Sequence, residues 1–135
     1  IALDSGADGV HIGQDDISYD QCYQMLGDDA IIGVTCHASR DLAIEAGDKG
    51  ADYVAFGAFF PSKSKEVKHH ADADLLEFWS NMTVVPCVAI GGITAENCAP
   101  LVENGANYLA VIGSVWDHKD DPEAGVRAFI EQLPQ

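Results

Sequence analysis

Three copies of one short pattern set the organisation of this chain. Each copy has a glycine, an alanine, an aspartate or asparagine and then an apolar run, and the copies begin at Gly6, Gly50 and Gly105. A glycine, a small residue and a turn residue before an apolar run are typical of the point where a helix ends and a strand begins. Strands that alternate with helices in this way predict βαβ units and a parallel sheet.

Five apolar runs are short enough to be strands and are bounded by turn residues. We expect strands over Gly9–Ile12, Ala30–Thr35, Tyr53–Gly57, Val84–Ile90 and Leu109–Ile112. The nearly continuous apolar run Val84–Ile90 predicts a strand that is buried on both faces.

A helix is expected after each strand, and the chain opens on the last turn of an earlier helix. The expected helices lie at about Tyr19–Leu26, from Ser39 to about Gly47, Asp74–Asn81, Thr94 to about Asn104, and Pro122–Leu133, with the tail of the earlier helix at Ile1–Ser5. Ser39 and Thr94 are suited to cap their helices, and proline is favoured in the first turn.

The length of the chain limits which α/β fold it can form. A full (β/α)₈ barrel needs about 200 residues or more, and this chain has 135. We therefore predict a single domain over residues 1–135 that is the back portion of a TIM barrel, strands four to eight, with the first three βα units missing. A free-standing five-stranded open α/β sheet is the alternative, and its two edges would then need cover.

Charge and cysteine content restrict the partners and the compartment. The net charge of −15 argues against nucleic acid or an anionic membrane as partner. No apolar run approaches the length of about 20 residues that a membrane span needs, and Ile1 does not open a signal-peptide pattern. The four cysteines lack CxxC spacing, and Cys87 fits a core position. We expect a reduced, cytoplasmic protein, and a homo-oligomer is compatible with this sequence.

Two strand ends carry glycine. The run Val84–Ile90 ends at Gly91 and Gly92, and the next strand ends at Gly113. Backbone N–H groups without neighbouring side chains, at the carboxyl ends of consecutive strands, can bind an anion. The last two strands of a (β/α)₈ barrel often hold a phosphate in this way. We predict a phosphate site here, and the alternative is that the glycines only make tight turns.

Polar residues follow the other strands, and the carboxyl ends of parallel strands share one edge of a sheet. In the loop Gln14-Asp15-Asp16, the two aspartate carboxylates can hold Mg²⁺, which neutralises a diphosphate. In the loop Phe59–Lys65, Ser62, Ser64 and Lys65 supply hydroxyl donors and a cation for phosphate oxygens. Chance clustering of lysines on a solvated loop is the alternative.

Five motifs, in order along almost the whole chain, resemble those of the thiamine phosphate synthase family. They are G-V-H-I-G-Q-D-D, I-I-G-V-T-C-H, G-A-D-Y-V-A-F-G-A-F-F-P-S-x-S-K, V-A-I-G-G-I-T-x-x-N and G-A-N-Y-L-A-V-I. The resemblance implies a (β/α)₈ barrel that joins hydroxymethylpyrimidine diphosphate to thiazole phosphate and releases diphosphate, with Mg²⁺ as cofactor.

The resemblance also implies roles for individual residues. Asp16 would be a Mg²⁺ ligand, and Thr35 and Lys65 would contact the pyrimidine diphosphate as the catalytic residues. Ser62 and Ser64 would bind the thiazole phosphate, where the family more often has threonine at one or both positions. The remaining phosphate contacts would come from Gly91, Gly92, Ile112 and Gly113. The family often has serine at the position of Gly113, so only the backbone N–H is left there.

This chemistry needs positioned charges rather than a protein nucleophile. An electron-rich aminopyrimidine can lose its diphosphate as Mg²⁺ and Lys65 stabilise the leaving group, and the thiazole nitrogen then attacks. Cys36 and His37 are therefore not expected to be catalytic. For His11, a hydrogen-bonded structural role is favoured over a ligand role. Trp116 is expected either to cover a ligand or to pack in the core.

Two other functions stay open. A thiazole tautomerase shares the scaffold but needs neither Mg²⁺ nor diphosphate, and Gln14, Asp16 and Lys65 favour the synthase over it. A non-catalytic phosphate-binding domain would bind ligand without turnover. The family's glutamine/arginine/lysine motif after its second strand and Asn-Asp after its third strand are not in this chain. A second Mg²⁺ carboxylate and much of the pyrimidine pocket would therefore come from elsewhere.

Overall fold

The computed structural model describes residues 2–61 and 69–134. Its centre is a parallel sheet of five strands whose order in space is their order in the chain, β1-β2-β3-β4-β5. The strands are β1 (Gly9–Ile12), β2 (Ile31–His37), β3 (Tyr53–Gly57), β4 (Cys87–Ile90) and β5 (Tyr108–Ala110). Sequential parallel strands joined by helices are the arrangement that the repeated pattern predicts, and the α/β class is confirmed.

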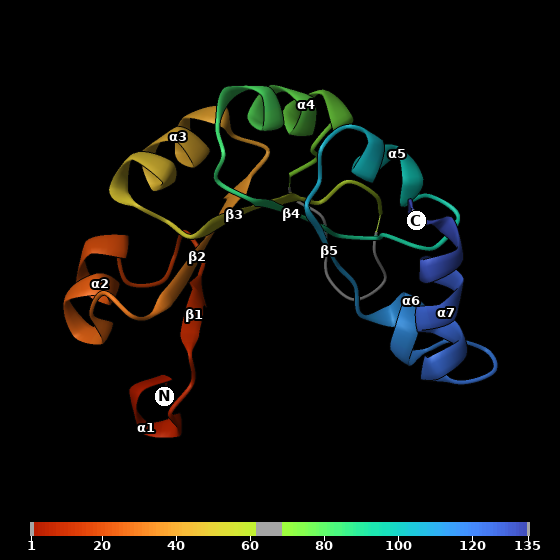
Figure 1. Ribbon diagram of the computed structural model, residues 1–135, viewed down its shortest axis with the longest axis horizontal. Coiled ribbons are helices and arrows are strands. Elements are labelled where there is room, and N and C mark those ends of the chain that lie inside the picture. Colours follow the sequence, from red (N-terminus) through yellow and green to blue (C-terminus); the bar gives the residue numbers. More distant parts are fainter. Residues whose placement is uncertain (1, 62–68, 135) are drawn as a thin grey trace.

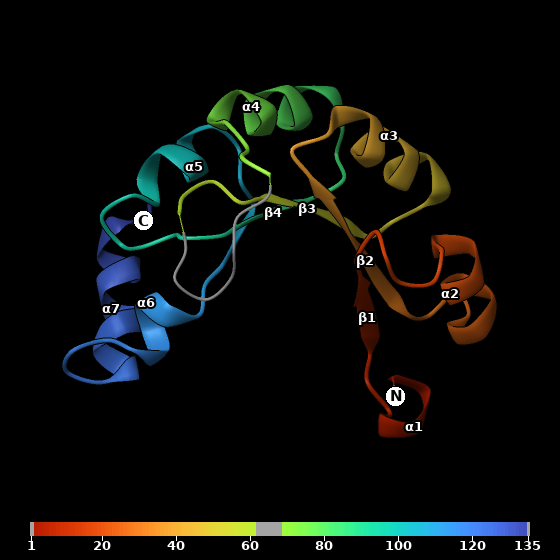
Figure 2. The ribbon, with the colours of Figure 1, turned by 180° about the vertical axis from the view of Figure 1, so that it is seen from behind.

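The helices lie along one side of the curved sheet. They are α1 (Ala2–Ser5), α2 (Tyr19–Leu26), α3 (Arg40–Lys49), α4 (Ala73–Met82), α5 (Ala99–Glu103), α6 (Gly113–Trp116) and α7 (Pro122–Gln132). In Figure 1 the sheet forms an arch with α2, α3, α4 and α5 around its outer, convex side. The view from behind shows the same arrangement, and no helix crosses the concave side (Figure 2). Among the described residues, every helix is too short or too polar to span a membrane.

The repeated pattern works as predicted at the junction of α3 and β3. Gly50 ends α3 in the left-handed conformation, with its N–H bonded to the carbonyl groups of Ala46 and Gly47. The carboxylate of Asp52 then accepts the backbone N–H of Ile32 on the neighbouring strand over 2.7 Å. The turn residue of the pattern therefore holds the start of the preceding strand, which is a function beyond ending a helix.

The core lies between the convex face of the sheet and the helices. Trp79 of α4 meets the Phe56 ring of β3 edge to face, with the ring centroids 5.8 Å apart, and its indole N–H donates to the carbonyl of Val85 over 2.8 Å. Phe78 is half-buried beneath the Arg40 guanidinium, 4.2 Å from the ring centroid. The largest fully buried side chains are Trp79, Phe56, Ile32, Leu76, Val54, Cys36, Cys87 and Cys98.

Strand β4 is shorter than predicted and is buried on one face only. It begins at Cys87 because Pro86 has no N–H to give to the ladder, and Val84 before it is 98% exposed. Cys87 and Ala89 face the core, whereas Ile90 lies on the concave side and is exposed. The prediction of a strand buried on both faces was wrong because no described residue covers the concave face.

Helix α5 and strand β5 also differ from their predicted bounds. The helix begins at Ala99 with Cys98 as its N-cap, so the prediction that Thr94 caps it was wrong. Pro100 explains the difference, because proline is tolerated in the first turn of a helix and not in its interior. Strand β5 ends at Ala110, and Ile112 belongs to the turn before α6.

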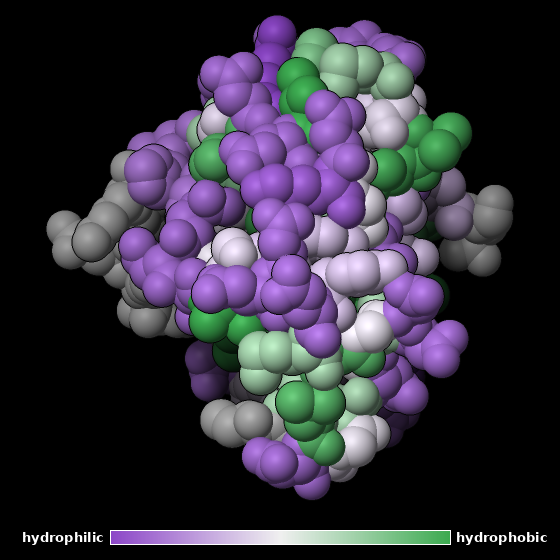
Figure 3. Space-filling model, turned by 90° about the vertical axis from the view of Figure 1, so that its left-hand side faces the viewer, coloured by the Kyte–Doolittle hydropathy of each residue, from purple (hydrophilic) through white to green (hydrophobic). Residues whose placement is uncertain are grey.

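The surface reflects the acidic composition. Figure 3 views the molecule from the side on which α2 lies in Figure 1, and hydrophilic side chains cover much of this face, with apolar side chains in small groups between them. One ion-pair cluster on this part of the chain joins Lys49 to Glu45 over 2.7 Å and to Asp20 over 3.8 Å. Exposed pairs of this kind contribute little to stability.

Candidate active site

The side chains predicted at the ends of β1 and β2 meet at one edge of the sheet. Gln14, in the turn after β1, donates from its side-chain amide to the carbonyl of Thr35 over 2.5 Å. Asp16, in the same turn, accepts the backbone N–H of Gly13 through Oδ2 over 2.7 Å. This bond fixes the turn and holds the carboxylate beside the end of β1.

His11 joins this group from the middle of β1. Its Nε2 lies 2.7 Å from the Thr35 hydroxyl, and its Nδ1 lies 3.0 Å from the Tyr53 hydroxyl. Both ring nitrogens therefore have partners, as expected for a structural histidine. Desolvation lowers the pKa of His11, and the nearby Asp16 carboxylate opposes this shift.

The glycines after β4 are held tightly by the loop after β3. Gly92 has φ +65, and a Cβ there would overlap the carbonyl oxygens of Phe60 and Pro61. Gly91 faces Ala58 with as little space, and its carbonyl accepts the Phe60 N–H over 3.1 Å. The loop after β3 leaves no room for a side chain at either position, which supports the interpretation that these glycines make tight turns. A phosphate at their backbone N–H groups stays a prediction.

The turns after β4 and β5 are bonded to each other. The Ser114 hydroxyl donates to the carbonyl of Ile93 over 2.8 Å. The Asn97 side chain closes the first turn, because its amide donates to the Gly92 carbonyl over 3.2 Å and its oxygen accepts the Thr94 N–H over 2.8 Å. The predicted phosphate residues Gly92 and Gly113 thus belong to two joined turns at the same edge.

The predicted residues Ser62, Ser64 and Lys65 lie outside the described residues. The base of their loop is described: the Ala58 N–H donates to the His69 carbonyl, and the Ala71 N–H to the Ala58 carbonyl, each over 2.9 Å. Pro61, the last described residue before these positions, lies against Gly92. The loop after β3 therefore starts beside the glycine turn.

Buried thiols occupy the interior behind this edge. All four cysteines are free and buried, and Cys87 is a core residue as predicted. Burial raises the pKa of Cys36 to about 12, so this thiol is protonated at neutral pH. The described residues hold no group of three or more histidine, cysteine, aspartate or glutamate side chains that could bind a metal ion.

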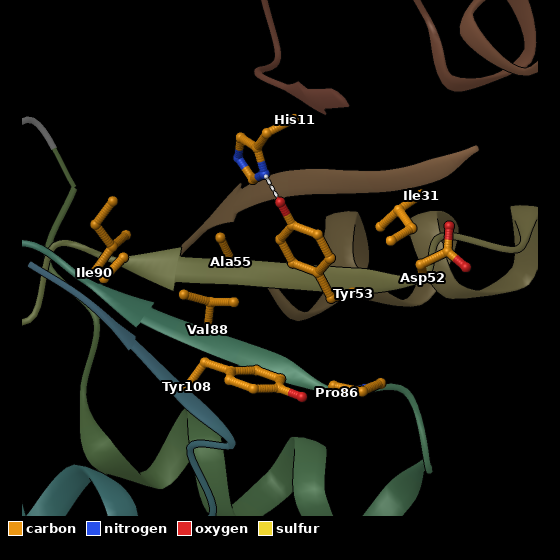
Figure 4. A pocket seen from close by; sticks show the side chains of 10 residues that line it. His11, Ile31, Asp52, Tyr53, Ala55, Pro86, Val88, Ile90 and Tyr108 are labelled. Carbon is orange, nitrogen blue, oxygen red and sulfur yellow. Dashed lines mark hydrogen bonds between the residues drawn. The ribbon is translucent and has the colours of Figure 1, made fainter. Parts of the chain in front are cut away.

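The concave face forms a wide cavity of about 620 Å³ below the edge. Residues from all five strands line it, β1 contributing His11 and the other strands mainly apolar side chains, and Figure 4 shows Tyr53 directed from β3 towards His11. Sequence reasoning did not connect Tyr53 with His11, because the link depends on strand register. Trp116 is 69% exposed, so core packing within this chain was the wrong alternative for it.

A parallel sheet of this topology, with polar residues and glycine turns along its carboxyl edge, is typical of α/β proteins that bind ligands at the strand ends. A family model described as thiamine monophosphate synthase matches residues 1–115. The chain belongs to the thiamine monophosphate synthase family.

Individual relatives agree with this assignment. The chain is 56% identical over 129 residues to the thiamine-phosphate synthase of Rhodospirillum centenum, covering 96% of this chain and 62% of the relative. It is 58% identical over 130 residues to that of Erythrobacter litoralis, covering 94% and 60%. The solved structure of a Pyrococcus furiosus thiamine phosphate pyrophosphorylase superposes with a TM-score of 0.80 at 31% identity, covering 98% of this chain and 64% of that one. The chain thus spans about three-fifths of the length of the curated relatives it matches.

Proposed function

We propose that the protein containing this chain is a thiamine phosphate synthase, which couples hydroxymethylpyrimidine diphosphate to thiazole phosphate and releases diphosphate. The carrying observation is that the carboxyl edge holds both the Gln14–Thr35 hydrogen bond and the Asp16 carboxylate, which is fixed by the Gly13 N–H, in a chain that is 56% identical to a thiamine-phosphate synthase. The substrates come from the family resemblance, and the residues below are assigned from their places at that edge.

The diphosphate half of the site lies at β1 and β2 in this proposal. The Thr35 hydroxyl donates to a diphosphate oxygen, and Lys65 supplies the positive charge that the leaving group needs. Burial of the Cys36 thiol, with its pKa raised to about 12, supports a mechanism in which this neighbour is not the nucleophile. The protein then acts chiefly by orienting two substrates.

Asp16 is the proposed Mg²⁺ ligand. One of its oxygens accepts the Gly13 N–H, and the other has no hydrogen bond to the described residues. Mg²⁺ commonly binds one or two carboxylates together with substrate phosphates. A single carboxylate facing a diphosphate fits that donor set. Bound there, the ion would neutralise the departing diphosphate.

The thiazole phosphate occupies the joined turns after β4 and β5 in this proposal. The backbone N–H groups at Gly91, Gly92, Ile112 and Gly113 are its donors, with Ser62 and Ser64 added from the loop after β3. The bond between Ser114 and Ile93 supports this assignment, because it holds the two turns together before a ligand arrives.

The chain is, in this proposal, strands four to eight of an eight-stranded barrel, and residues 1–135 are part of one domain. Parallel sheets are normally covered on both faces, yet Tyr108 on the concave face is 62% exposed and Ile31 is 50% exposed. Further strands would cover that face and both sheet edges. Asp8 adds support, because it occupies the position of Asp52 in the first copy of the repeat and its carboxylate has no hydrogen-bond partner among the described residues.

The test is an assay of the complete gene product with both substrates and Mg²⁺, followed by measurement of thiamine phosphate and diphosphate. The proposal expects equal amounts of the two products. Binding of both substrates without turnover would instead indicate a phosphate-binding domain, and isomerisation of thiazole carboxylate phosphate without diphosphate release would indicate a tautomerase. Four free, buried thiols are compatible with the reducing cytoplasm, where we place the protein.

A further inference from the structure

A row of hydrogen bonds crosses three strands on the concave face. It runs from the Tyr53 hydroxyl on β3 to Nδ1 of His11 on β1, over 3.0 Å (Figure 4), and from Nε2 of His11 to the Thr35 hydroxyl on β2, over 2.7 Å. The rings of His11 and Tyr53 also stack, with centroids 5.5 Å apart and planes inclined by 24°. The imidazole is therefore fixed in position and orientation.

Gly33 makes this row sterically feasible. The register places His11 beside Gly33 on β2, and Gly33 beside Tyr53 on β3. A Cβ at Gly33 would overlap the Tyr53 ring, so the ring lies directly over this glycine. Absence of one side chain on β2 thus lets a residue of β3 reach a residue of β1.

Thr35 is held from two sides by residues of the β1 segment. His11 contacts its hydroxyl, and Gln14 donates to its carbonyl over 2.5 Å. The Gln14 bond occupies only the backbone carbonyl, so the Thr35 hydroxyl keeps hydrogen-bonding capacity for a ligand beside its contact with His11. What Thr35 can offer a ligand depends on where the protons of the row lie.

The heavy-atom positions are compatible with two arrangements of the protons along the row, which we call proton orders. A neutral imidazole has one N–H donor and one acceptor nitrogen, and desolvation, which lowers the pKa of His11, favours the neutral form. If Thr35 donates to Nε2, its hydroxyl has only lone pairs left for a ligand. If Nε2–H donates to Thr35, the threonine proton is free, and Tyr53 must then donate to Nδ1.

Only the second order suits an anionic ligand, because phosphate oxygens accept hydrogen bonds and repel lone pairs. We propose that His11 is a positioning residue for Thr35: Tyr53 donates to Nδ1, Nε2–H donates to Thr35, and Thr35 donates to an oxygen of the substrate diphosphate. The identity of that ligand rests on the proposed function, whereas the proton order is a property of the chain itself.

This order has a kinetic consequence. Negative charge grows on the diphosphate as it leaves, so a donor aimed at it contributes more in the transition state than in the ground state. Successive hydrogen bonds also polarise one another, which makes the last donor in the row stronger. Loss of His11 should therefore lower kcat more than it raises KM.

The first experiment measures the histidine tautomer by ¹⁵N NMR in the complete, ligand-free protein, with the His11 signals assigned by their loss in His11→Gln. We expect protonated Nε2 and unprotonated Nδ1. In Tyr53→Phe, which removes the donor to Nδ1, we expect the two tautomers to mix. A wild-type protein with protonated Nδ1 and unprotonated Nε2 would overturn the proposal, whatever its activity.

The second experiment compares substitutions that keep different halves of the imidazole. The Gln side chain in His11→Gln can reach Thr35 with an N–H donor, whereas the shorter side chain in His11→Asn reaches only towards Tyr53. We expect kcat to fall about tenfold or more in His11→Asn, with KM within about threefold, and substantial rescue in His11→Gln. Equal kcat in wild type and a folded His11→Asn variant would refute the positioning role.

Tyr108→Phe is the matched control for Tyr53→Phe. Tyr108 lies on the same face, and its hydroxyl has no hydrogen bond to the described residues, so its removal should leave kcat unchanged. We expect kcat in Tyr53→Phe to fall by a factor of about three to ten. If the wild-type protein made no thiamine phosphate, the proposed function would fail, and the tautomer measurement would still decide the proton order.

Discussion

The side-chain oxygen of Asn107 accepts the backbone N–H of Cys87 over 2.8 Å, at the point where β4 begins. Asp52 does the same for Ile32 at the start of β2. In both cases the third residue of the repeated pattern holds a backbone N–H in the first two residues of the preceding parallel strand. The pattern therefore joins neighbouring strands as well as marking the end of each helix.

A first prediction uses this regularity to test whether a strand precedes β1. In the complete protein, Asp52→Ala should lower the free energy of unfolding by about 1–3 kcal/mol, because it leaves a buried N–H unpaired. Asp8→Ala should cost a similar amount if Asp8 holds a preceding strand. The exposed Asp48 is the control, and Asp48→Ala should stay within about 0.5 kcal/mol in urea denaturation. The barrel proposal would be contradicted if Asp52→Ala lowered the free energy of unfolding and Asp8→Ala changed it no more than Asp48→Ala does.

A second prediction concerns the glycine turn after β4. Gly92→Ala places a methyl group against the carbonyl oxygens of Phe60 and Pro61 at φ +65. We expect a loss of about 1–3 kcal/mol from overpacking beyond the backbone cost, and a raised KM for thiazole phosphate. Gly27→Ala is the matched control, because Gly27 has φ +83 with nothing within 4 Å of a Cβ. Equal melting temperatures for the two variants would show that the packing against this loop is not tight.

A third prediction concerns the thiols. Burial raises the pKa of Cys36 to about 12, so Cys36→Ala should keep turnover within a few fold. In the native protein, the four buried cysteines should react with a thiol reagent at pH 7.5 only after denaturation. A total loss of turnover in a folded Cys36→Ala variant would mean that the mechanism needs this side chain.

A fourth prediction concerns Mg²⁺ at Asp16. The Asn in Asp16→Asn can keep the hydrogen bond from the Gly13 N–H but lacks the charge. We expect the Mg²⁺ concentration for half-maximal activity to rise about tenfold or more, because Mg²⁺ prefers carboxylate oxygens. Asp29→Asn makes the same charge change in the turn before β2, at the opposite edge of the sheet, and should leave that concentration unchanged. An unchanged Mg²⁺ titration for Asp16→Asn would exclude Asp16 as a ligand.

Local signals in the sequence predicted the elements well. Strands β1 and β3 have the predicted bounds, and Ser39 caps α3 by accepting the Leu42 N–H over 3.2 Å. These features depend on neighbouring residues, which a sequence shows directly. The start of α5 was misplaced because the cap preference of Thr94 was weighed above the restriction that Pro100 imposes.

Contacts across strands could not be predicted in the same way. The sequence predicted that Gln14, Asp16 and Thr35 lie at one edge, and in the structure Gln14 also bonds to Thr35, which was not predicted. It did not connect His11 with Tyr53, because that contact depends on register and on the space over Gly33. The exposure of Ile90 was also missed, because burial of a strand depends on what covers its second face.

The final prediction follows from the pKa of His11, which desolvation holds below its ordinary value of 6.5 while Asp16 opposes the shift. As the pH falls below 6.5, His11 is therefore protonated in the unfolded chain before it is protonated in the folded state. The contribution of His11 to stability is thus present above pH 6.5 and is lost as the pH falls through the folded pKa. Urea denaturation of wild type and His11→Gln between pH 7.5 and 4.5 should show a difference in unfolding free energy that changes over this window in favour of the variant at low pH. Carboxylates elsewhere titrate equally in both proteins and cancel in the difference. A difference that stays constant with pH would mean that His11 titrates alike in the folded and unfolded states.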